Sequence, residues 1–137
     1  MDNVDIVIVC AGISGVSEAV HLKKMCPKKT IRILEARDSL GGTWDLFRYP
    51  GIRSDSDMHT LGFSFKPWRE AKSIADGPSI LKYVRETVEE HGLLDLIQFN
   101  QRLTKAEWDS STAKWTIEVD GPGSAGALKT AKCNFLM

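Results

Sequence analysis

The sequence predicts an α/β fold whose core is a parallel sheet. Three observations predict it: a β-branched apolar run at residues 5–10, a turn of small residues at 11–15, and a helical pattern that leads into a second apolar run at 30–34. Strand, tight turn, helix and strand in such close succession make a βαβ unit. The right-handed crossover of that unit places its two strands parallel to each other.

Each element of the unit has its own local signal. Residues 5–10 have the composition of a strand that is buried on both faces. A helix is expected over residues 14–25, and residues 27–29 end it. Residues 30–34 form the second strand, which Glu35 closes. The buried face of the helix is expected to consist of Val16, Ala19, Val20 and Met25.

The remaining chain predicts a long loop, a helix and further strands. Residues 38–76 show no clear periodicity but contain many aromatics, which indicates a functional loop and not a disordered one. Pro78 starts a helix over 78–91, and Gly92 stops it. A strand is expected at 97–102, a hairpin from 103–108 and 114–119 around a turn at 109–112, a loop at 121–126 and a last strand at 131–137. The parallel core should contain the first two strands and the last, with the hairpin at one side.

Composition excludes several classes of protein. The chain has 137 residues, is 42% hydrophobic and 26% charged, and its formal net charge is zero. This balance is typical of a globular chain and disfavours nucleic acid as a partner. The longest apolar stretch is too short for stable insertion into a membrane, and no secretory signal is visible. Cys10, Cys26 and Cys133 form no redox pair, so reduced thiols and a cytoplasmic location are expected.

Residues 133–137 read as the middle of a buried strand, because this apolar run has no cap or turn after it. We therefore expect residues 1–137 to be the N-terminal part of a longer domain. A short edge strand that ends the protein is the alternative.

The turn after the first strand resembles a dinucleotide-binding fingerprint. Gly12 and Gly15 occupy the second and third positions of G-x-G-x-x-G, where the backbone approaches a pyrophosphate and the helix packs closely on the strand. The amides at the helix N-terminus would face the phosphates. Cys10 stands where the first glycine makes the tight turn, which is a departure from the pattern. Alone, the turn could equally be a glycine-rich corner that binds nothing.

Glu35 strengthens the binding interpretation. It ends the second strand about twenty residues after the turn, where an acidic side chain hydrogen-bonds the ribose hydroxyls of a dinucleotide. A carboxylate there repels a 2′-phosphate, so the site suits the adenosine of FAD or NAD better than that of NADP. A solvated acid at a strand end is the alternative.

A second glycine-rich motif separates FAD from NAD. Gly41 and Gly42 precede Thr43 and Trp44, and this combination suits a flavin, which needs close backbone approach and a flat apolar wall. The longer string GGTWDLFRYPGIRSDSDM at residues 41–58 is similar to the N-terminal region of flavin Baeyer–Villiger monooxygenases, especially the subgroup that activates thioamide prodrugs such as ethionamide. The resemblance extends over nearly the whole chain. It implies a Rossmann-like FAD-binding βαβ fold with a parallel core and an added β-hairpin or meander, in an incomplete domain.

The resemblance also implies site residues. Ser14 would touch the FAD phosphates, Leu103 would meet the adenine through its backbone, and Asp55 would lie beside the reactive edge of the flavin as the catalytic acid. The flavin would be lined by Gly42, Thr43, Trp44, Asp45 and Leu46, and the nicotinamide site would be bordered by Arg53, Ser54 and Asp55. The alternatives are core packing for the aromatics and a surface ion pair for Arg53 and Asp55. No metal site is predicted.

Enzymes of this family use NADPH and FAD with molecular oxygen to insert an oxygen atom beside a ketone carbonyl, or to oxygenate the sulfur of a thioether or thioamide. The NADPH-binding unit, the FxGxxxHxxxW fingerprint and the catalytic arginine of the family do not occur in this sequence. We therefore expect the chain alone to be inactive. Two other functions stay open: a flavin monooxygenase that oxygenates nitrogen or sulfur, and a non-catalytic nucleotide-binding module.

Overall fold

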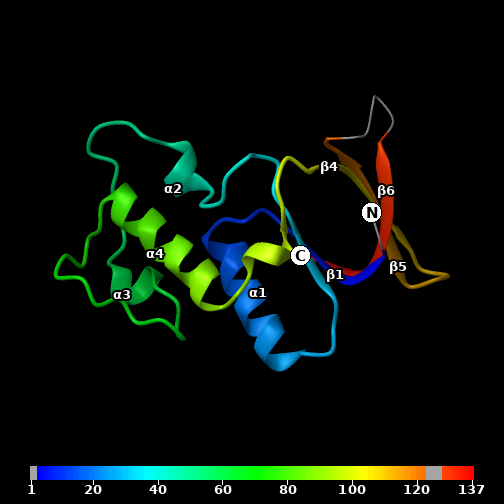
Figure 1. Cartoon of the computed structure of the whole chain (residues 1–137), viewed down its shortest axis with the longest axis horizontal. Helices are drawn as coiled ribbons and strands as arrows, with labels where there is room; N and C mark the ends of the chain where they lie inside the picture. The colour runs from blue at the N-terminus through cyan, green and yellow to red at the C-terminus, as the bar shows by residue number, and fades with distance from the viewer. Residues whose placement is uncertain (1–2, 123–127) are drawn as a thin grey trace.

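The computed structural model describes residues 3–122 and 128–137. Its N-terminal unit is the expected βαβ arrangement: β1 (Val4–Val9), α1 (Ile13–Met25) and β2 (Ile31–Leu34). The two strands are parallel, with Ile6 opposite Ile31 and Val9 opposite Leu34. Figure 1 shows α1 packed to one side of the sheet, as a right-handed crossover requires.

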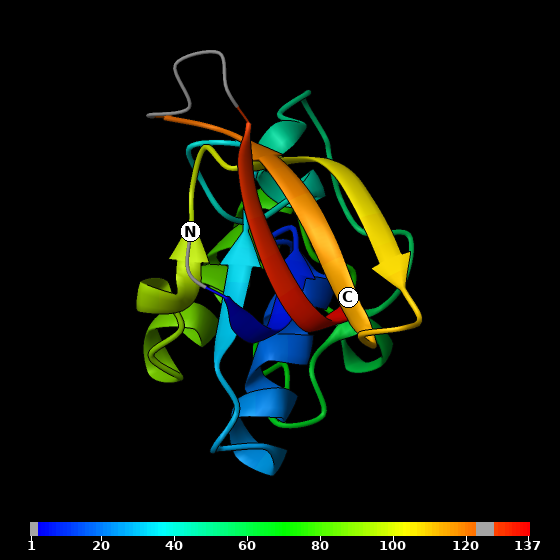
Figure 2. The same ribbon diagram turned by 90° about the vertical axis from the view of Figure 1, so that its right-hand side faces the viewer.

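The described strands form one sheet in the order β3-β2-β1-β6-β5-β4. Its other members are β3 (Ile97–Gln98), β4 (Arg102–Asp109), β5 (Lys114–Asp120) and β6 (Lys129–Leu136). The long strand β6 pairs parallel with β1 at one end and antiparallel with β5 at the other. The parallel core of the first two strands and the last is therefore confirmed. The hairpin continues the same sheet, which curls where β5 and β4 are added (Figure 2).

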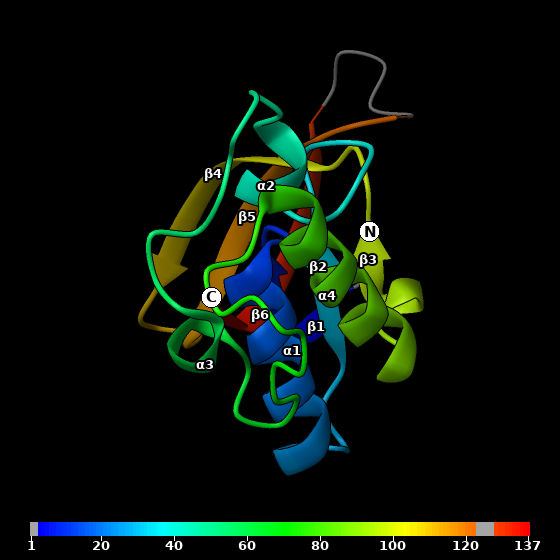
Figure 3. The same cartoon turned by 90° about the vertical axis from the view of Figure 1, so that its left-hand side faces the viewer.

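Helices cover one face of the sheet. Figure 3 shows α4 (Gly77–Glu90) lying across α1 in front of the strands. Asp76 caps α4 by accepting a hydrogen bond from the Ser79 amide, and Pro78 occupies its first turn, so the helix begins where the sequence predicts. Gly92 follows the helix with φ 58°, a conformation that glycine adopts without strain.

The core has two parts because β1 is buried on both faces. Ile6 and Ile8 point to the helical side, where they join a cluster with α1 and α4. Val7 points to the other face and packs with Ile117 and Val119 of the curled hairpin. Full burial of each such side chain stabilises the fold by roughly 1.5–3 kcal/mol. Because its side chains alternate between the two faces, β1 contributes to both clusters.

The structure corrects three sequence-based expectations. The strand expected at 97–102 ends at Gln98, because Asn100 adopts φ 55° and turns the chain before β4 begins. Met25 is 76% exposed and not part of the buried face, since it is the last residue of α1 and lies past the sheet. The loop at 38–76 contains two short helices, α2 (Thr43–Leu46) and α3 (Met58–Leu61).

A 3-10 helix, η1 (Leu94–Leu96), connects α4 to β3. The expected loop at 121–126 lies for the most part outside the described residues. Among the helices that the structure describes, none is long and apolar enough to cross a membrane.

Candidate cofactor-binding site

The turn between β1 and α1 has the geometry of a phosphate-binding corner. Gly12 is the N-cap of α1 and provides no side-chain cap, so the first amides of the helix have no side-chain acceptor from that position. A Cβ atom on Gly15 would lie 2.1 Å from the carbonyl oxygen of Cys10, so only glycine fits there. Gly15 thus has the close-packing role that the fingerprint assigns to its third glycine.

Cys10 has φ 81°, which is the left-handed conformation that a glycine normally adopts. The first position of the fingerprint therefore keeps the conformation required of a glycine while carrying a side chain. Burial raises the pKa of the Cys10 thiol, and the nearby charge of Glu35 raises it further. The thiol is therefore neutral at pH 7 and a poor nucleophile.

Glu35 joins the turn to the end of β2. It is buried, and its two carboxylate oxygens accept hydrogen bonds from the amides of Ala11, at 2.8 Å, and Arg37, at 2.9 Å. A carboxylate has about four acceptor sites, so two remain for the hydroxyls of a ribose. The solvated strand-end acid considered above does not describe this side chain.

The second glycine loop lies directly against the first. The Gly41 amide donates a 2.9 Å hydrogen bond to the Ala11 carbonyl. A Cβ atom built on Gly42 would lie 3.0 Å from the Cα atom of Gly12, and Gly42 has φ 54°. The backbones of the two loops therefore touch at Gly12 and Gly42, and neither side chain intrudes where a cofactor would approach.

The residues after the second loop point in different directions. Thr43 and Leu46 are exposed on α2. Trp44 packs against the core cluster and lines a cavity of about 800 Å³ between α2, residues 47–52 and the first half of α4. The Trp44 ring therefore packs in part against the core, as the core-packing alternative for the aromatics predicted.

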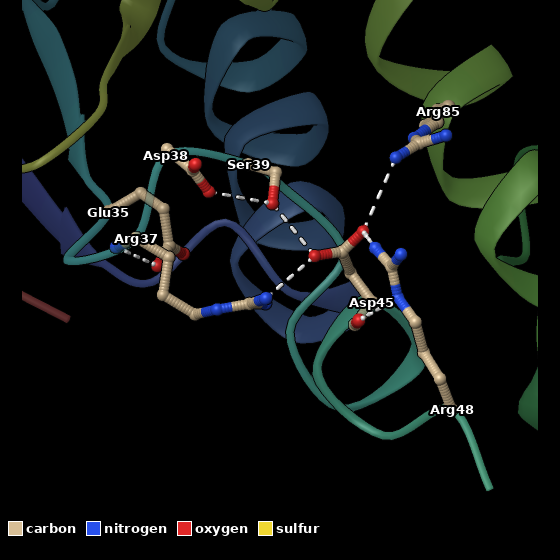
Figure 4. Close-up of polar contacts among 7 residues, drawn as sticks. All are labelled: Glu35, Arg37, Asp38, Ser39, Asp45, Arg48 and Arg85. Atoms are coloured by element: carbon tan, nitrogen blue, oxygen red, sulfur yellow. Dashed lines mark hydrogen bonds and ion pairs between the residues drawn. The ribbon is translucent and has the colours of Figure 1, made fainter.

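Asp45 is the only residue of α2 that is buried, and its side chain has 0% exposure. Figure 4 shows its carboxylate at the centre of a polar cluster with Arg37, Arg48 and Arg85. Burial alone would raise the pKa of Asp45, but the hydrogen bonds from Ser39 and Arg37 and the charge of Arg37 outweigh it and lower the pKa. Asp45 is therefore ionised, and its carboxylate is directed at arginines of this chain.

The Arg53, Ser54 and Asp55 segment lies beside the start of α4. Arg53 forms an antiparallel bridge with Asp76, and the hydroxyl of buried Ser54 donates a 2.7 Å hydrogen bond to the Ser56 carbonyl. Asp55 is exposed. Its carboxylate is therefore available to a partner, while the Ser54 hydroxyl is already satisfied within the loop.

Asp57 has a different environment from Asp55. It is the N-cap of α3, where its carboxylate accepts hydrogen bonds from the amide and the hydroxyl of Thr60 at 3.0 and 2.9 Å. These bonds lower the pKa of Asp57. The role of this carboxylate is structural.

Leu103 and Ser14 come from separate elements, β4 and α1. Leu103 lies near the start of β4, opposite Val119, and the chain just before it is tied to Glu35 by a 2.9 Å bond from the Gln101 amide to the Glu35 carbonyl. Ser14 is exposed in the first turn of α1 and lines a hollow of about 430 Å³.

The residues present fit FAD on the chemistry of their donors and acceptors. Glu35 offers a carboxylate for a ribose, the uncapped start of α1 offers amides for an anion, and Gly12 and Gly42 leave the backbone accessible. In the described residues, no group of three or more His, Cys, Asp or Glu side chains could hold a metal ion.

Sequence reasoning missed the arginines around Asp45. Arg48 could have been found, because it lies only three residues after Asp45 in the sequence. Arg37 and Arg85 come from the end of β2 and from α4, and no sequence spacing relates them to Asp45.

The fold and this corner define a dinucleotide-binding α/β domain. The family model for the NAD(P)-binding Rossmann-like domain matches residues 8–77, which is half of the chain, and the chain belongs to that family.

Curated relatives are FAD-containing monooxygenases. The chain is 51% identical over 135 residues to "FAD-containing monooxygenase EthA" of Mycobacterium tuberculosis, covering 98% of this chain and 27% of the relative. It is 57% identical over 122 residues to the EthA of Mycolicibacterium smegmatis, covering 89% of this chain and 25% of the relative. The chain thus spans about a quarter of the length of these relatives.

Solved structures agree with this placement. An oxidized steroid monooxygenase bound to NADP superposes with a TM-score of 0.85 at 29% identity, over 99% of this chain and 25% of that one. OTEMO in complex with FAD and NADP superposes with a TM-score of 0.83 at 26% identity, over 97% of this chain and 25% of that one. The resemblance to flavin monooxygenases is confirmed, and FAD and NADP are the cofactors named for these relatives.

Proposed function

We propose that this chain is the N-terminal, FAD-binding part of an NADPH-dependent Baeyer–Villiger monooxygenase. Substrates would be small ketones, which gain an oxygen atom beside the carbonyl, or thioethers and thioamides, which gain it on sulfur. The observation that carries the proposal is the contact of two glycine loops beside a buried acid: Gly12 against Gly42, with Glu35 bound to the Ala11 amide. The similarity to FAD-containing monooxygenases supports it.

The residues of the chain would divide the cofactor between them. Glu35 would accept hydrogen bonds from the ribose, Leu103 would meet the adenine through its backbone, and the amides after Gly12, with Ser14, would bind the phosphates. Gly15 would keep α1 close to β1. The flavin itself, when bound, supplies the chemistry with oxygen and NADPH.

The second loop would hold the flavin and the nicotinamide. Gly42, Thr43, Trp44, Asp45 and Leu46 would border the flavin, with Asp45 acting through its backbone because its carboxylate is occupied by arginines. Arg53, Ser54 and Asp55 would border the nicotinamide. Exposed Asp55 would orient a cationic group from the rest of the enzyme by bidentate hydrogen bonds and so shape the field at the reactive edge.

Residues 1–137 would then form part of one FAD-binding domain in a longer, cytoplasmic enzyme. Three free cysteines agree with a reducing compartment. The chain alone would not turn over, because the family's NADPH-binding unit and catalytic arginine have no counterpart in its sequence.

Purification of the complete enzyme tests the proposal. The purified enzyme should show a visible flavin spectrum. With oxygen and a cyclic ketone, it should oxidise NADPH and produce a lactone. Products confined to N-oxides or S-oxides would favour the broader class of oxygenating flavin monooxygenases. A colourless protein that binds no added FAD would favour a non-catalytic module and overturn the proposal.

A further inference from the structure

The Asp45 carboxylate is fully used within the protein. Its Oδ2 accepts from Arg37 Nη2 at 2.8 Å and from the Ser39 hydroxyl at 2.7 Å. Its Oδ1 accepts from Arg48 Nη2 at 3.0 Å and from Arg85 Nη2 at 3.3 Å. Four donors saturate the acceptor sites of one carboxylate, so this side chain has no further site for a ligand (Figure 4).

Asp45 lies in α2, directly after the second glycine loop, so the cluster supports the conformation of that loop. Helix α2 has four residues, which is too short for cooperative helix formation without tertiary support. Asp45 provides that support from inside the helix, and its own amide donates to the Gly42 carbonyl at 3.1 Å. The loop that touches Gly12 is therefore anchored through Asp45.

The three arginines come from three different parts of the fold. Arg37 follows β2, Arg48 follows α2 and Arg85 lies in the middle of α4. Burying a charge is costly unless partners compensate it, so removing the central carboxylate would leave three guanidinium groups facing one another. Without the carboxylate, α2 would lose its ties to the end of β2 through Arg37 and to α4 through Arg85.

We propose that Asp45 is a positioning residue for the cofactor: by gathering Arg37, Arg48 and Arg85 it holds the Gly41–Gly42 loop against Gly12, in the arrangement that FAD would require. This inference rests on the proposed function. It changes the expected role of Asp45 from a flavin contact to a residue that acts through its neighbours.

The arrangement also concentrates positive charge beside the turn. Three guanidinium groups share one carboxylate, which leaves two positive charges in excess within the cluster. Nη1 of Arg37 is buried with no hydrogen-bond acceptor among the described residues. The Asp45 carboxylate compensates one of these charges and bonds all three guanidinium groups, so its loss leaves the whole cluster without a central acceptor.

The test is Asp45→Asn in the complete enzyme, because asparagine keeps the shape and removes the charge. The FAD dissociation constant should rise about tenfold or more, as expected for loss of a charge-assisted anchor. The visible circular dichroism of any bound flavin should change, because the ring environment is no longer fixed. In the FAD-free protein, trypsin should cut after Arg48 faster than in the parent.

Two controls isolate the effect. Asp95→Asn removes one exposed carboxylate from η1 and should change neither FAD binding nor cleavage. Asp109→Asn weakens the hairpin turn between β4 and β5, where Asp109 accepts bonds from Ser111 and Thr112, and should lower thermal stability without raising the FAD dissociation constant. Arg85→Gln, at a half-exposed position, provides a milder variant if Asp45→Asn does not fold.

A double-mutant cycle supplies the readout that general destabilisation would not move. Arg85→Gln in the Asp45→Asn background should partly restore FAD affinity, because it removes one of the uncompensated charges. If Asp45→Asn lowers thermal stability but leaves FAD affinity and the flavin spectrum within twofold of the parent, the positioning role is wrong. A parent enzyme that binds no FAD overturns the proposed function instead, and the trypsin comparison still decides whether Asp45 anchors the loop.

Discussion

The Cα atom of Gly12 lies so close to Gly42 that a Cβ atom on Gly42 would come within 3.0 Å of it, whereas a Cβ atom on Gly12 would lie 3.6 Å from the Gly42 Cα atom. The contact is therefore asymmetric. Gly42 also has φ 54°, while Gly12 has φ −83° and tolerates a side chain.

Because of this asymmetry, substitutions at Gly12 and Gly42 should differ in their effect on stability although both should affect cofactor binding. Gly12→Ala should cost at most about 1 kcal/mol of stability, the difference between glycine and alanine at an N-cap, yet should abolish FAD binding if the backbone approaches the pyrophosphate there. Gly42→Ala should cost about 1–3 kcal/mol, because φ 54° with ψ −127° is a conformation that residues with a Cβ atom rarely adopt, and it should lose FAD as well. Thermal unfolding without FAD and flavin titration measure the two effects, and FAD retention by Gly12→Ala would contradict the phosphate role.

Cys10→Gly should stabilise the protein. A side chain at φ 81° is strained by about 1–2 kcal/mol, while added freedom of glycine in the unfolded chain offsets about 0.4–1 kcal/mol, so a net gain of several tenths of a kcal/mol is expected. Flavin occupancy should improve in parallel. Cys26→Ala, outside the turn, serves as the thiol control. A lower unfolding temperature for Cys10→Gly would show that the thiol contributes packing that outweighs the strain.

Glu35→Ala should weaken FAD binding by about tenfold to a hundredfold, because hydrogen bonds to a charged group contribute roughly 1.5–3 kcal/mol. It should also destabilise the FAD-free protein, since the Ala11 and Arg37 amides lose their acceptor. Glu35→Gln keeps one carbonyl acceptor and should be intermediate in both. Dialysis followed by absorbance at the flavin band measures the affinity, and parent-like retention by the alanine variant would count against the ribose role.

Asp55 and Asp57 should give opposite results although they are only two positions apart in the sequence. Asp55→Ala in the complete enzyme should keep the bound flavin and the unfolding temperature but slow reduction by NADPH, product formation or both, because Asp55 is exposed and free to orient a cation. Asp57→Ala should cost about 0.5–2 kcal/mol of stability through the lost cap of α3, with turnover less affected. If Asp57→Ala slowed turnover more than Asp55→Ala, the assignment of Asp55 as the active-site acid would be wrong.

Acid should destabilise the fold through its hydrogen-bonded aspartates. The pKa is lowered for Asp45, Asp57 and Asp76, and hydrogen bonds in the hairpin turn lower the pKa of Asp109 from 3.8 to about 2. A carboxyl group whose pKa is lower in the folded protein stabilises the fold at pH values above its unfolded-state pKa, which is near 4. That stabilisation is lost as the pH falls through the folded-state pKa. Denaturant titrations between pH 5 and pH 2 should show a steady fall that is shallower in Asp109→Asn; parallel curves would refute the contribution of Asp109.

The sequence alone determined the features that rest on local rules. The apolar run before Gly12, the helix after it and Glu35 at the end of β2 predicted the βαβ unit, because strand composition, helical spacing and turn chemistry are properties of neighbouring residues. Asp109 to Thr112 predicted the hairpin turn for the same reason. The resemblance of residues 41–58 to flavin monooxygenases needed no coordinates either.

Tertiary structure decided what depends on distant partners. Helix α2 is too short to be stable by itself, and only the fold brings Arg37 and Arg85 to Asp45. The place of β6 between β1 and β5 is likewise set by pairing between distant strands and not by its own pattern. The left-handed conformation of Cys10 follows from the turn that Gly15 and the β2 end impose on it, since the Cys10 amide bonds the Leu34 carbonyl at 2.8 Å.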